Sequence, residues 1–208
     1  MKVYISPSNQ NGNKYAYGGT NEMAVCNRIA DKVVELLKIN NFEAKKAPSG
    51  QDMYNSITES NRFNADLHIC IHTNAGGGHG TEIYTFDKSA ECMRYAEPIY
   101  NNLAKLTNST RGIKQASFAE IMQTTAICIY VEAEFHDTTT LAKWIVNNIN
   151  PIAKAIVQGI CTGANKEYKD DNSHIYRVQV GAFTEKRGAE NLAKELNAKG
   201  YKTIIKVD

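Results

Sequence analysis

The sequence of 208 residues contains few tryptophan, proline and cysteine residues. It has one tryptophan, four prolines and five cysteines. The cysteines are widely spaced, at Cys26, Cys70, Cys92, Cys128 and Cys161, and no CxxC pair occurs. Neither a cysteine zinc site nor a disulfide framework is therefore indicated. We expect the cysteines to be small core residues of a protein in a reducing compartment.

The chain also lacks a charge imbalance and long apolar runs. Lys and Arg number 24 and Asp and Glu number 22, for a net charge of +2. Because nucleic-acid-binding domains usually carry a clear basic excess, we expect no nucleic acid as a partner. No apolar stretch is long enough to span a bilayer, and no secretory signal pattern follows Met1. We expect synthesis in the cytoplasm and no membrane insertion.

Strand and helix patterns alternate along most of the chain. The length fits one domain of ordinary size with a small appendage. Strands are predicted at 3–5, 42–47, 67–72, 81–86 and 126–131, and helices at 22–37, 54–63, 90–106 and 141–161. A loop is predicted to begin at Arg111 and to extend toward the strand at 126–131. Alternation of this kind predicts an α/β fold, with a mostly parallel, twisted sheet flanked by helices.

The stretch at 65–75, ADLHICIHTNA, is the centre of the predicted domain. Apolar residues alternate there with His68, Cys70 and His72 in the two-residue period of a strand, and a glycine loop follows at 76–78. In open α/β sheets ligands bind outside the carboxyl ends of the strands. His72 is therefore a candidate for chemistry, although a single histidine at a strand end is also common as a structural or surface residue.

Two carboxylates occupy comparable positions. Glu22 lies in the first turn of the first predicted helix, where it could also simply complement the helix dipole, an effect of roughly 0.3–1 kcal/mol. Glu132 follows the apolar run at 126–131, which is typical of a buried strand. If this strand continues, Glu132 and Glu134 point to one face, and the pKa of one carboxyl is raised toward that of a general base. In the alternative, which we favour, Glu134 turns away into the loop.

Five segments occur in a fixed order between residue 1 and about residue 163: Glu22, ADLHICIHTNA at 65–75, GTEIY at 80–84, RGIK at 111–114 and VEAEF at 131–135. This series resembles the zinc-dependent N-acetylmuramoyl-L-alanine amidases of the Amidase_3 type. The resemblance implies a peptidoglycan substrate and cleavage of the amide between the lactyl group of N-acetylmuramic acid and the L-alanine of the stem peptide. It further implies that Glu22 and His72 are zinc ligands and that Glu132 is the catalytic carboxylate, which takes a proton from a metal-activated water.

The sequence departs from the family at the first strand. There the family has Asp-Pro-Gly-His-Gly-Gly, whose histidine is a zinc ligand, whereas this chain has SPSNQN at 6–11, with Asn9 in the place of the histidine. A neutral amide oxygen is a poorer partner for zinc than an imidazole. Three alternatives follow. Asn9 or Gln10 ligates the metal through its carbonyl; His79 or His136 substitutes; or the metal is lost, which leaves a protein that only binds peptidoglycan.

The resemblance also provides candidates for substrate binding, which are Asn74, Glu82, Arg111 and Gln10. A more distant alternative is a metal-dependent hydrolase of another small amide. Without a signal peptide, the protein would act at the cell wall after release by lysis or by a helper pathway, as a phage endolysin or an autolysin does.

The C-terminal part forms a separate segment in this interpretation. Residues 1–163 form the amidase-like domain, 164–173 a polar linker, and 174–208 a small βαβ unit with strands at 175–183 and 201–207. Between these strands we predict a helix that Thr184 can cap and that ends at Gly200. The VQVGAF and KGY sequences resemble the opening half of a SPOR domain, a peptidoglycan-binding module. Because so small a unit buries too little apolar surface to be stable alone, we expect a homodimer through 174–208, with docking on the first domain as the alternative.

Overall fold

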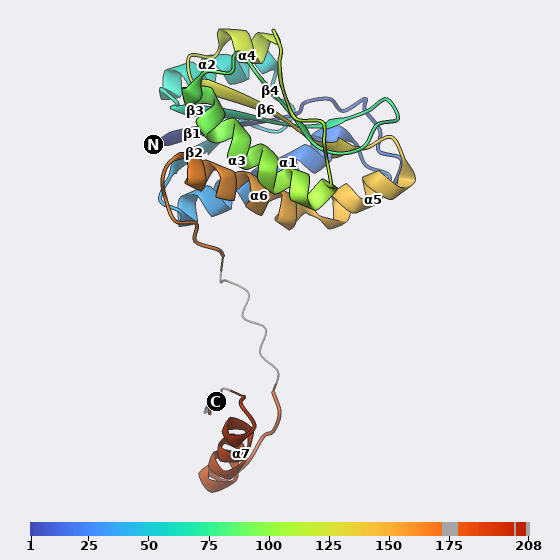
Figure 1. The fold of residues 1–208 in the computed structure, drawn as a ribbon. Coiled ribbons are helices and arrows are strands. Elements are labelled where there is room, and N and C mark those ends of the chain that lie inside the picture. The colour runs from blue at the N-terminus through green and yellow to red at the C-terminus, as the bar shows by residue number, and fades with distance from the viewer. Residues whose placement is uncertain (172–178, 202, 207–208) are drawn as a thin grey trace. The chain divides into compact units, whose positions relative to one another are not determined.

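The computed structural model describes residues 1–171, 179–201 and 203–206. The chain divides into two compact units, Met1–Asp171 and Asn172–Asp208 (Figure 1). The strands of the first unit are β1 (Lys2–Pro7), β2 (Glu43–Lys46), β3 (Leu67–Asn74), β4 (Glu82–Thr85), β5 (Ile113–Gln115) and β6 (Ile127–Phe135). Its helices are α1 (Glu22–Ile39), α2 (Met53–Phe63), α3 (Ala90–Thr107), α4 (Ala119–Gln123), α5 (Thr139–Asn147) and α6 (Ile149–Gly163).

The strands form one mixed sheet in the order β2-β1-β3-β6-β4-β5. β1 pairs in parallel with β2 and β3, and β3 pairs in parallel with β6. β4 runs antiparallel to β6, and β5 runs parallel to β4. The predicted α/β fold with a mostly parallel sheet between helices is thus confirmed. The carboxyl ends of β1, β3 and β6 lie side by side, which is where ligands bind in such sheets.

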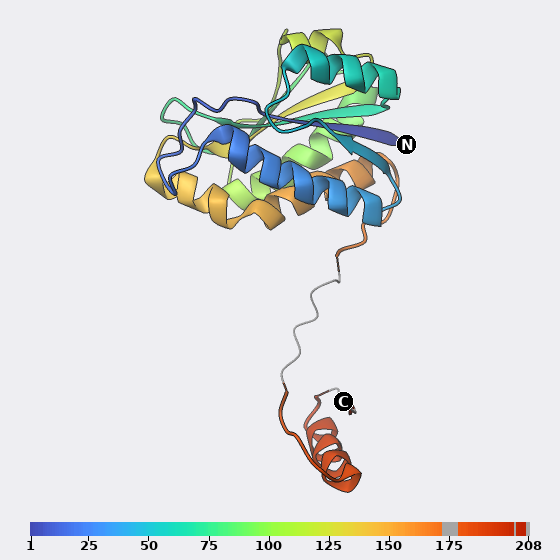
Figure 2. The ribbon, with the colours of Figure 1, turned by 180° about the vertical axis from the view of Figure 1, so that it is seen from behind.

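Helices cover both faces of the sheet. Helices α1, α3 and α6 pack on one face, and α2 and α4 lie on the other (Figure 1). Figure 2 shows the same two layers from behind, with α1 along the face that α6 also covers. In β3, Leu67, Ile69 and Ile71 belong to the large core under α1, α3 and α6. Cys70 belongs to a small cluster with Ile121 and Cys128 on the opposite face, so β3 is buried on both sides.

The structure corrects three of the expected element bounds. The helix expected at 141–161 is two helices, because Asn148 leaves the helical conformation and Pro151, which lacks an N–H, sits in the first turn of α6. The region after Arg111, expected to be a loop, contains β5 and α4. Strand β6 continues to Phe135, so Glu132 and Glu134 both lie within it.

Residues 164–171, which follow α6, contact helices α1 and α6. The amide of Asn40, at the end of α1, exchanges hydrogen bonds of 2.8 and 2.6 Å with the backbone of Lys169. Asp171 forms ion pairs with Lys32 and Lys154. Because of these contacts, the polar stretch expected to be a linker belongs to the first unit as far as Asp171.

The second unit contains helix α7 (Lys186–Ala198). The helix ends as predicted at Gly200, whose φ of +89° is readily adopted by glycine. Residues 179–183, 201 and 203–206 are not in strands, whereas 175–178, 202 and 207 lie outside the described residues. A strand needs a neighbouring strand for its backbone hydrogen bonds, and the described part of this unit provides none. None of the helices in the described ranges has both the length and the hydropathy needed to cross a bilayer.

Candidate functional site

A cavity of about 280 Å³ opens at the carboxyl ends of β1, β3 and β6. The residues that line it include Asn9, Gln10, His72, Glu120, Tyr130 and Glu132. Three sequence-predicted residues from different strands or the loops after them, Asn9, His72 and Glu132, therefore share one cavity. Glu22 is not part of its lining but lies directly behind His72.

Glu22 and His72 are joined by a hydrogen bond between Glu22 Oε1 and His72 Nδ1, with a length of 2.9 Å. The second carboxylate oxygen, Oε2, accepts a hydrogen bond of 2.7 Å from Asn13 Nδ2. Although the near-complete burial of Glu22 alone would raise its pKa, the hydrogen bond and charge of His72 hold the pKa below the ordinary value. The fold thus keeps an ionised carboxylate beside the imidazole at the cavity wall.

Glu132 lies opposite His72 in the pairing of β3 with β6. Burial, together with the negative charges of Glu22 and Glu82, raises the pKa of Glu132 to about 8. Its Oε2 atom is buried and has no hydrogen-bond partner among the residues that the structure describes. A carboxyl group with a pKa near neutrality, held in a cavity, has the properties of a general base.

The residues present fit a metal ion. Two zinc ligands at about 2.0–2.1 Å from a tetrahedral ion lie roughly 3.3 Å apart, close to the 2.9 Å between Glu22 Oε1 and His72 Nδ1. The buried Glu132 Oε2 has no hydrogen-bond partner among the described residues, and a water at the metal would supply one. The donor set of one carboxylate and one imidazole is also common in zinc hydrolases.

Asn9 lines the same cavity as His72 and Glu132. It is exposed at the rim of the cavity, and its amide nitrogen donates a hydrogen bond of 3.1 Å to the carbonyl oxygen of Gln51. That contact orients the amide and leaves its carbonyl oxygen as the atom that can bind a metal. Gln10 also lines the cavity, and its side-chain oxygen accepts a hydrogen bond of 2.6 Å from Asn13.

The two histidines considered as substitutes do not line the cavity. His136 is buried, with Nδ1 3.0 Å from both Oγ1 and the carbonyl oxygen of Thr73. Its ring stacks on Tyr15 at a centroid distance of 4.9 Å. His136 thereby ties the loop before α1 to the end of β6, and it is occupied as a structural residue. His79 belongs to the glycine-rich loop after β3.

Asn74, Glu82 and Arg111 form a neighbouring cluster rather than a wall of the cavity. Glu82 lies opposite Glu132 in the antiparallel pair of β4 and β6. It accepts hydrogen bonds from Asn74 Nδ2 at 2.7 Å and from Arg111 Nε at 2.9 Å, and it also contacts Lys114. Burial of Glu82 would raise its pKa, but the hydrogen bonds from Arg111 and Lys114 lower the pKa to about 2. Glu82 is thus a permanent negative charge beside Glu132.

Glu134 does not join Glu132 in the cavity. Its Oε1 accepts hydrogen bonds from the backbone N–H of Gly80 at 2.5 Å and from its own neighbour Phe135 at 2.9 Å. The Phe135 ring lies against Gly78, where a Cβ atom would come within 2.2 Å of it. As we expected, only Glu132 of the two faces the cavity, but Glu134 remains within β6, and its hydrogen bond to Gly80 holds the glycine-rich loop on the end of that strand.

Several neighbours of the site were not predicted from the sequence. The Tyr130 ring stacks on the His72 ring at a centroid distance of 4.5 Å. The sequence did contain a signal for this position, because Tyr130 lies two residues before Glu132 and therefore on the same face of the predicted strand. Asn13 lies in an irregular loop, and no sequence pattern indicates its contact with Glu22. Glu120 lies on α4, which was expected to be loop.

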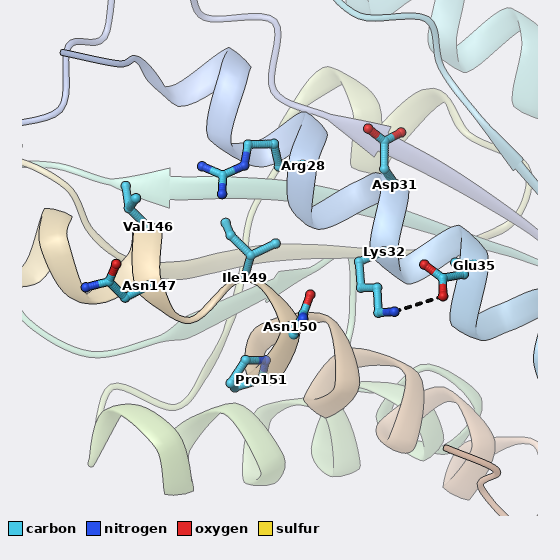
Figure 3. A pocket seen from close by; sticks show the side chains of 9 residues that line it. All are labelled: Arg28, Asp31, Lys32, Glu35, Val146, Asn147, Ile149, Asn150 and Pro151. Atoms are coloured by element: carbon cyan, nitrogen blue, oxygen red, sulfur yellow. Dashed lines mark hydrogen bonds and ion pairs between the residues drawn. The ribbon is translucent and has the colours of Figure 1, made fainter. Parts of the chain in front are cut away.

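A larger, shallow depression of about 590 Å³ lies elsewhere, between α1 and the junction of α5 and α6 (Figure 3). Figure 3 shows Arg28, Asp31, Lys32 and Glu35 along α1 at its edge, with an ion pair between Lys32 and Glu35. These are charged residues of a helix surface. None of the predicted site residues lines this depression.

Comparison with known families and proteins agrees with this geometry. A sequence model of the N-acetylmuramoyl-L-alanine amidase family (Amidase_3) matches residues 3–162, and the SPOR domain family matches residues 172–208. The chain is 28% identical to the sporulation-specific N-acetylmuramoyl-L-alanine amidase of Bacillus subtilis (strain 168), over 99% of this chain and 84% of the relative. It is 26% identical, with the same coverage, to the N-acetylmuramoyl-L-alanine amidase CwlM of Bacillus licheniformis.

Solved structures show the same fold. The catalytic domain of the amidase CwlV from Bacillus (Paenibacillus) polymyxa var. colistinus has a TM-score of 0.71 and 21% identity, and the match covers 80% of this chain and all of that domain. The catalytic domain of the CD27L endolysin, which targets Clostridia difficile, has a TM-score of 0.67 and 22% identity, over 81% of this chain and 99% of that one.

The raised pKa of Glu132 predicts how stability depends on pH. In the metal-free protein, the folded state keeps a proton on Glu132 up to about pH 8, whereas the unfolded chain releases it near the ordinary value of 4.5. Stability contributed by this proton is therefore complete below about pH 4.5 and is lost as the pH rises through about 8. Relative to Glu132→Gln, we expect the wild type to lose roughly 2–4 kcal/mol over that range.

Urea unfolding in chelator at several pH values measures this difference. The exposed Glu97→Gln on α3 is the matched control, for which we expect the wild-type dependence. A constant difference between wild type and Glu132→Gln at all pH values would contradict the prediction.

Proposed function

The chain belongs to the N-acetylmuramoyl-L-alanine amidase family, and we infer from this membership that it is a peptidoglycan hydrolase. It cleaves the amide between the lactyl group of N-acetylmuramic acid and the L-alanine of the stem peptide. The observation that best supports catalysis rather than mere binding is the buried Glu132 Oε2, which has no hydrogen-bond partner in the described part of the chain and lies beside the Glu22–His72 pair.

We propose Zn²⁺ as the cofactor, held by Glu22, His72 and the carbonyl oxygen of Asn9. Zinc with three protein ligands supplies an open position for water, lowers the pKa of that water to about 7 and polarises the scissile carbonyl. The stacking of Tyr130 on His72 fixes the plane of the imidazole, and the hydrogen bond from Asn13 fixes the Glu22 carboxylate. These contacts orient both ligands before the metal arrives.

Glu132 carries the proton transfers in this proposal. It accepts a proton from the water that attacks the lactyl carbonyl carbon, and it then donates a proton to the nitrogen of L-alanine as the amide bond breaks. Burial and the negative charges of Glu22 and Glu82 raise its proton affinity, which suits it to take up the proton in the first step. Because Glu82 stays ionised, it serves as a fixed charge and not as a second acid.

We assign substrate contact first to Gln10, which lines the cavity at its rim. Asn74, Glu82 and Arg111 remain candidates for substrate binding outside the cavity. Asn74 and Arg111 both donate hydrogen bonds to Glu82, which lies next to Glu132. Of these, Arg111 is partly exposed and lies over the Phe135 ring at 4.8 Å. Its cationic side chain could pair with a carboxylate of the stem peptide.

The second unit supports a role at the cell wall. Residues 172–208 match the SPOR family, which favours peptidoglycan binding by this unit. We propose that the protein reaches the wall after lysis or through a helper pathway. The fold is similar both to an endolysin domain and to a bacterial amidase domain, so we keep an endolysin and an autolysin as two alternatives within this proposal.

The first test of this proposed function concerns the carboxylate of Glu132. Glu132→Gln keeps the size of the side chain but cannot accept a proton, and general-base catalysis contributes about 10²- to 10⁴-fold. We expect a loss of that size in the release of new amino termini from purified cell walls, with wall binding in a pull-down unchanged. Glu97→Gln is the control. If the zinc-loaded wild type released no amino termini, the alternative of a non-catalytic wall-binding protein would replace the proposal.

The second prediction concerns Asn9. An amide oxygen binds zinc more weakly than imidazole does, so dialysis against a mild chelator should remove the zinc held by Glu22, His72 and Asn9 from the wild type. Asn9→His should retain about one more equivalent under the same dialysis, as measured by elemental analysis. Asn11→His, a neighbouring substitution in the same loop, is the control and should behave as the wild type does. Full retention of zinc by the wild type would contradict weak binding.

The third prediction concerns oligomeric state. A homodimer through 174–208 should appear as twice the chain mass in light scattering at micromolar concentration. Truncation after Asp171, at the boundary of the first unit, should give the mass of one chain. A single-chain mass for the full-length protein would favour the alternative, in which the second unit docks on its own first domain.

A further inference from the structure

A second group of metal-ligating side chains lies beneath the cavity floor. His68 and Cys70 on β3 and Cys128 on β6 place one ligand atom each within 4.8 Å of one another. All three are buried on the sheet face that α2 and α4 cover. The two sulfur atoms are 3.8 Å apart. None of these residues belongs to the site formed by Glu22, His72, Asn9 and Glu132.

A carboxylate from α4 adjoins this group. Glu120 is 4% exposed, and its Oε1 lies 3.0 Å from His68 Nε2. The three ligand atoms within 4.8 Å of one another are thus one imidazole nitrogen and two sulfur atoms, and the Glu120 carboxylate lies beside the imidazole.

The His68 ring is oriented as a metal-binding imidazole usually is. Its Nδ1 lies 2.9 Å from the hydroxyl oxygen of Ser60 on α2, and its Nε2 is directed at Glu120. The Tyr4 ring stacks on it at a centroid distance of 5.3 Å. An outer hydrogen bond of this kind fixes the ring plane and the tautomer of histidine ligands.

The spacing of the sulfur atoms agrees with one shared ion. At a Zn–S distance of about 2.3 Å and a tetrahedral angle, two thiolates lie roughly 3.8 Å apart, which is the separation observed here. Glu120 also lines the 280 Å³ cavity, so the group lies next to a space that is open to solvent. Without a metal, the same residues would be a buried His68–Glu120 ion pair, which contributes little net stability after desolvation.

We propose that His68, Cys70, Cys128 and Glu120 form a second, structural zinc site. Thiolates and imidazole together favour zinc, and four protein ligands leave no open position for water, as in structural sites. Binding releases the two thiol protons to solvent while the two Zn–S bonds form. The ion would fasten α4 to β3 and β6, and α4 begins directly after Phe118, a residue at the cavity wall.

Cobalt substitution of the full-length, reduced protein tests this site without relying on amidase activity. Thiolate ligands give Co²⁺ an ultraviolet charge-transfer absorption that carboxylate, imidazole and amide ligands do not. We expect this band in the wild type, with saturation at one equivalent, and its persistence in Glu22→Gln, which damages only the catalytic centre. We expect its loss in Cys128→Ser, whereas Cys92→Ser, a buried cysteine outside the group, should keep it. Absence of the band from the fully cobalt-loaded wild type, or its survival in Cys128→Ser, would overturn the proposal.

Thermal unfolding gives a second measurement in case Cys128→Ser folds poorly. Addition of Zn²⁺ should raise the unfolding midpoint of Glu22→Gln, in which the second site is intact, because a ligand bound only by the folded state stabilises it. An unchanged midpoint at saturating Zn²⁺ would contradict the site. A wall-inactive wild type that keeps the cobalt band would instead refute the proposed catalysis and leave this site standing.

Discussion

The hydrogen bond between Glu22 and His72 is the contact around which the domain is arranged. It joins the first turn of α1 to the carboxyl end of β3 across 50 residues of sequence, and both side chains are nearly buried. A buried carboxylate is stable only if it is paired, so the fold supplies His72 and Asn13 to Glu22 and supplies Arg111 and Lys114 to Glu82. Burial of Glu132 is the main cause of its raised pKa, and the negative charges of Glu22 and Glu82 raise it further. The raised pKa thus depends both on the buried position of Glu132 and on the two carboxylates that the fold keeps ionised beside it.

The sequence was sufficient to predict the strands, helices and site positions that follow from the spacing of apolar residues. The alternation at 67–72 and the apolar run at 126–131 fix two parallel strands, and their carboxyl ends bring His72 and Glu132 opposite each other. Glu22 was found because a helix start after the first strand must lie at the same edge. These inferences need only the two-residue and 3.6-residue periods and the handedness of βαβ units.

The contacts that the sequence did not reveal depend on irregular loops and on the pairing of strands that are distant in the sequence. The antiparallel course of β4 brings Glu82 to Glu132, but the period of a strand is the same in both directions. Asn13 reaches Glu22 from a loop without a repeating pattern. The cysteines were interpreted as core residues because sequence spacing reveals metal ligands only when they come from one local segment. Cys70 and Cys128 are 58 positions apart and meet only because β3 and β6 are neighbours.

The replacement of histidine by asparagine at position 9 can be weighed by its charge. A neutral imidazole and a carboxamide have the same formal charge, so the exchange leaves the electrostatic field of Glu22 and Glu82 at Glu132 unchanged. The two carboxylates that raise the pKa of Glu132 are both present and both tied down by hydrogen bonds. What differs is the donor strength of one ligand, since an amide oxygen gives less electron density to zinc than an imidazole nitrogen does. In the proposed site the exchange therefore affects metal affinity and not the proton transfer that we propose for Glu132.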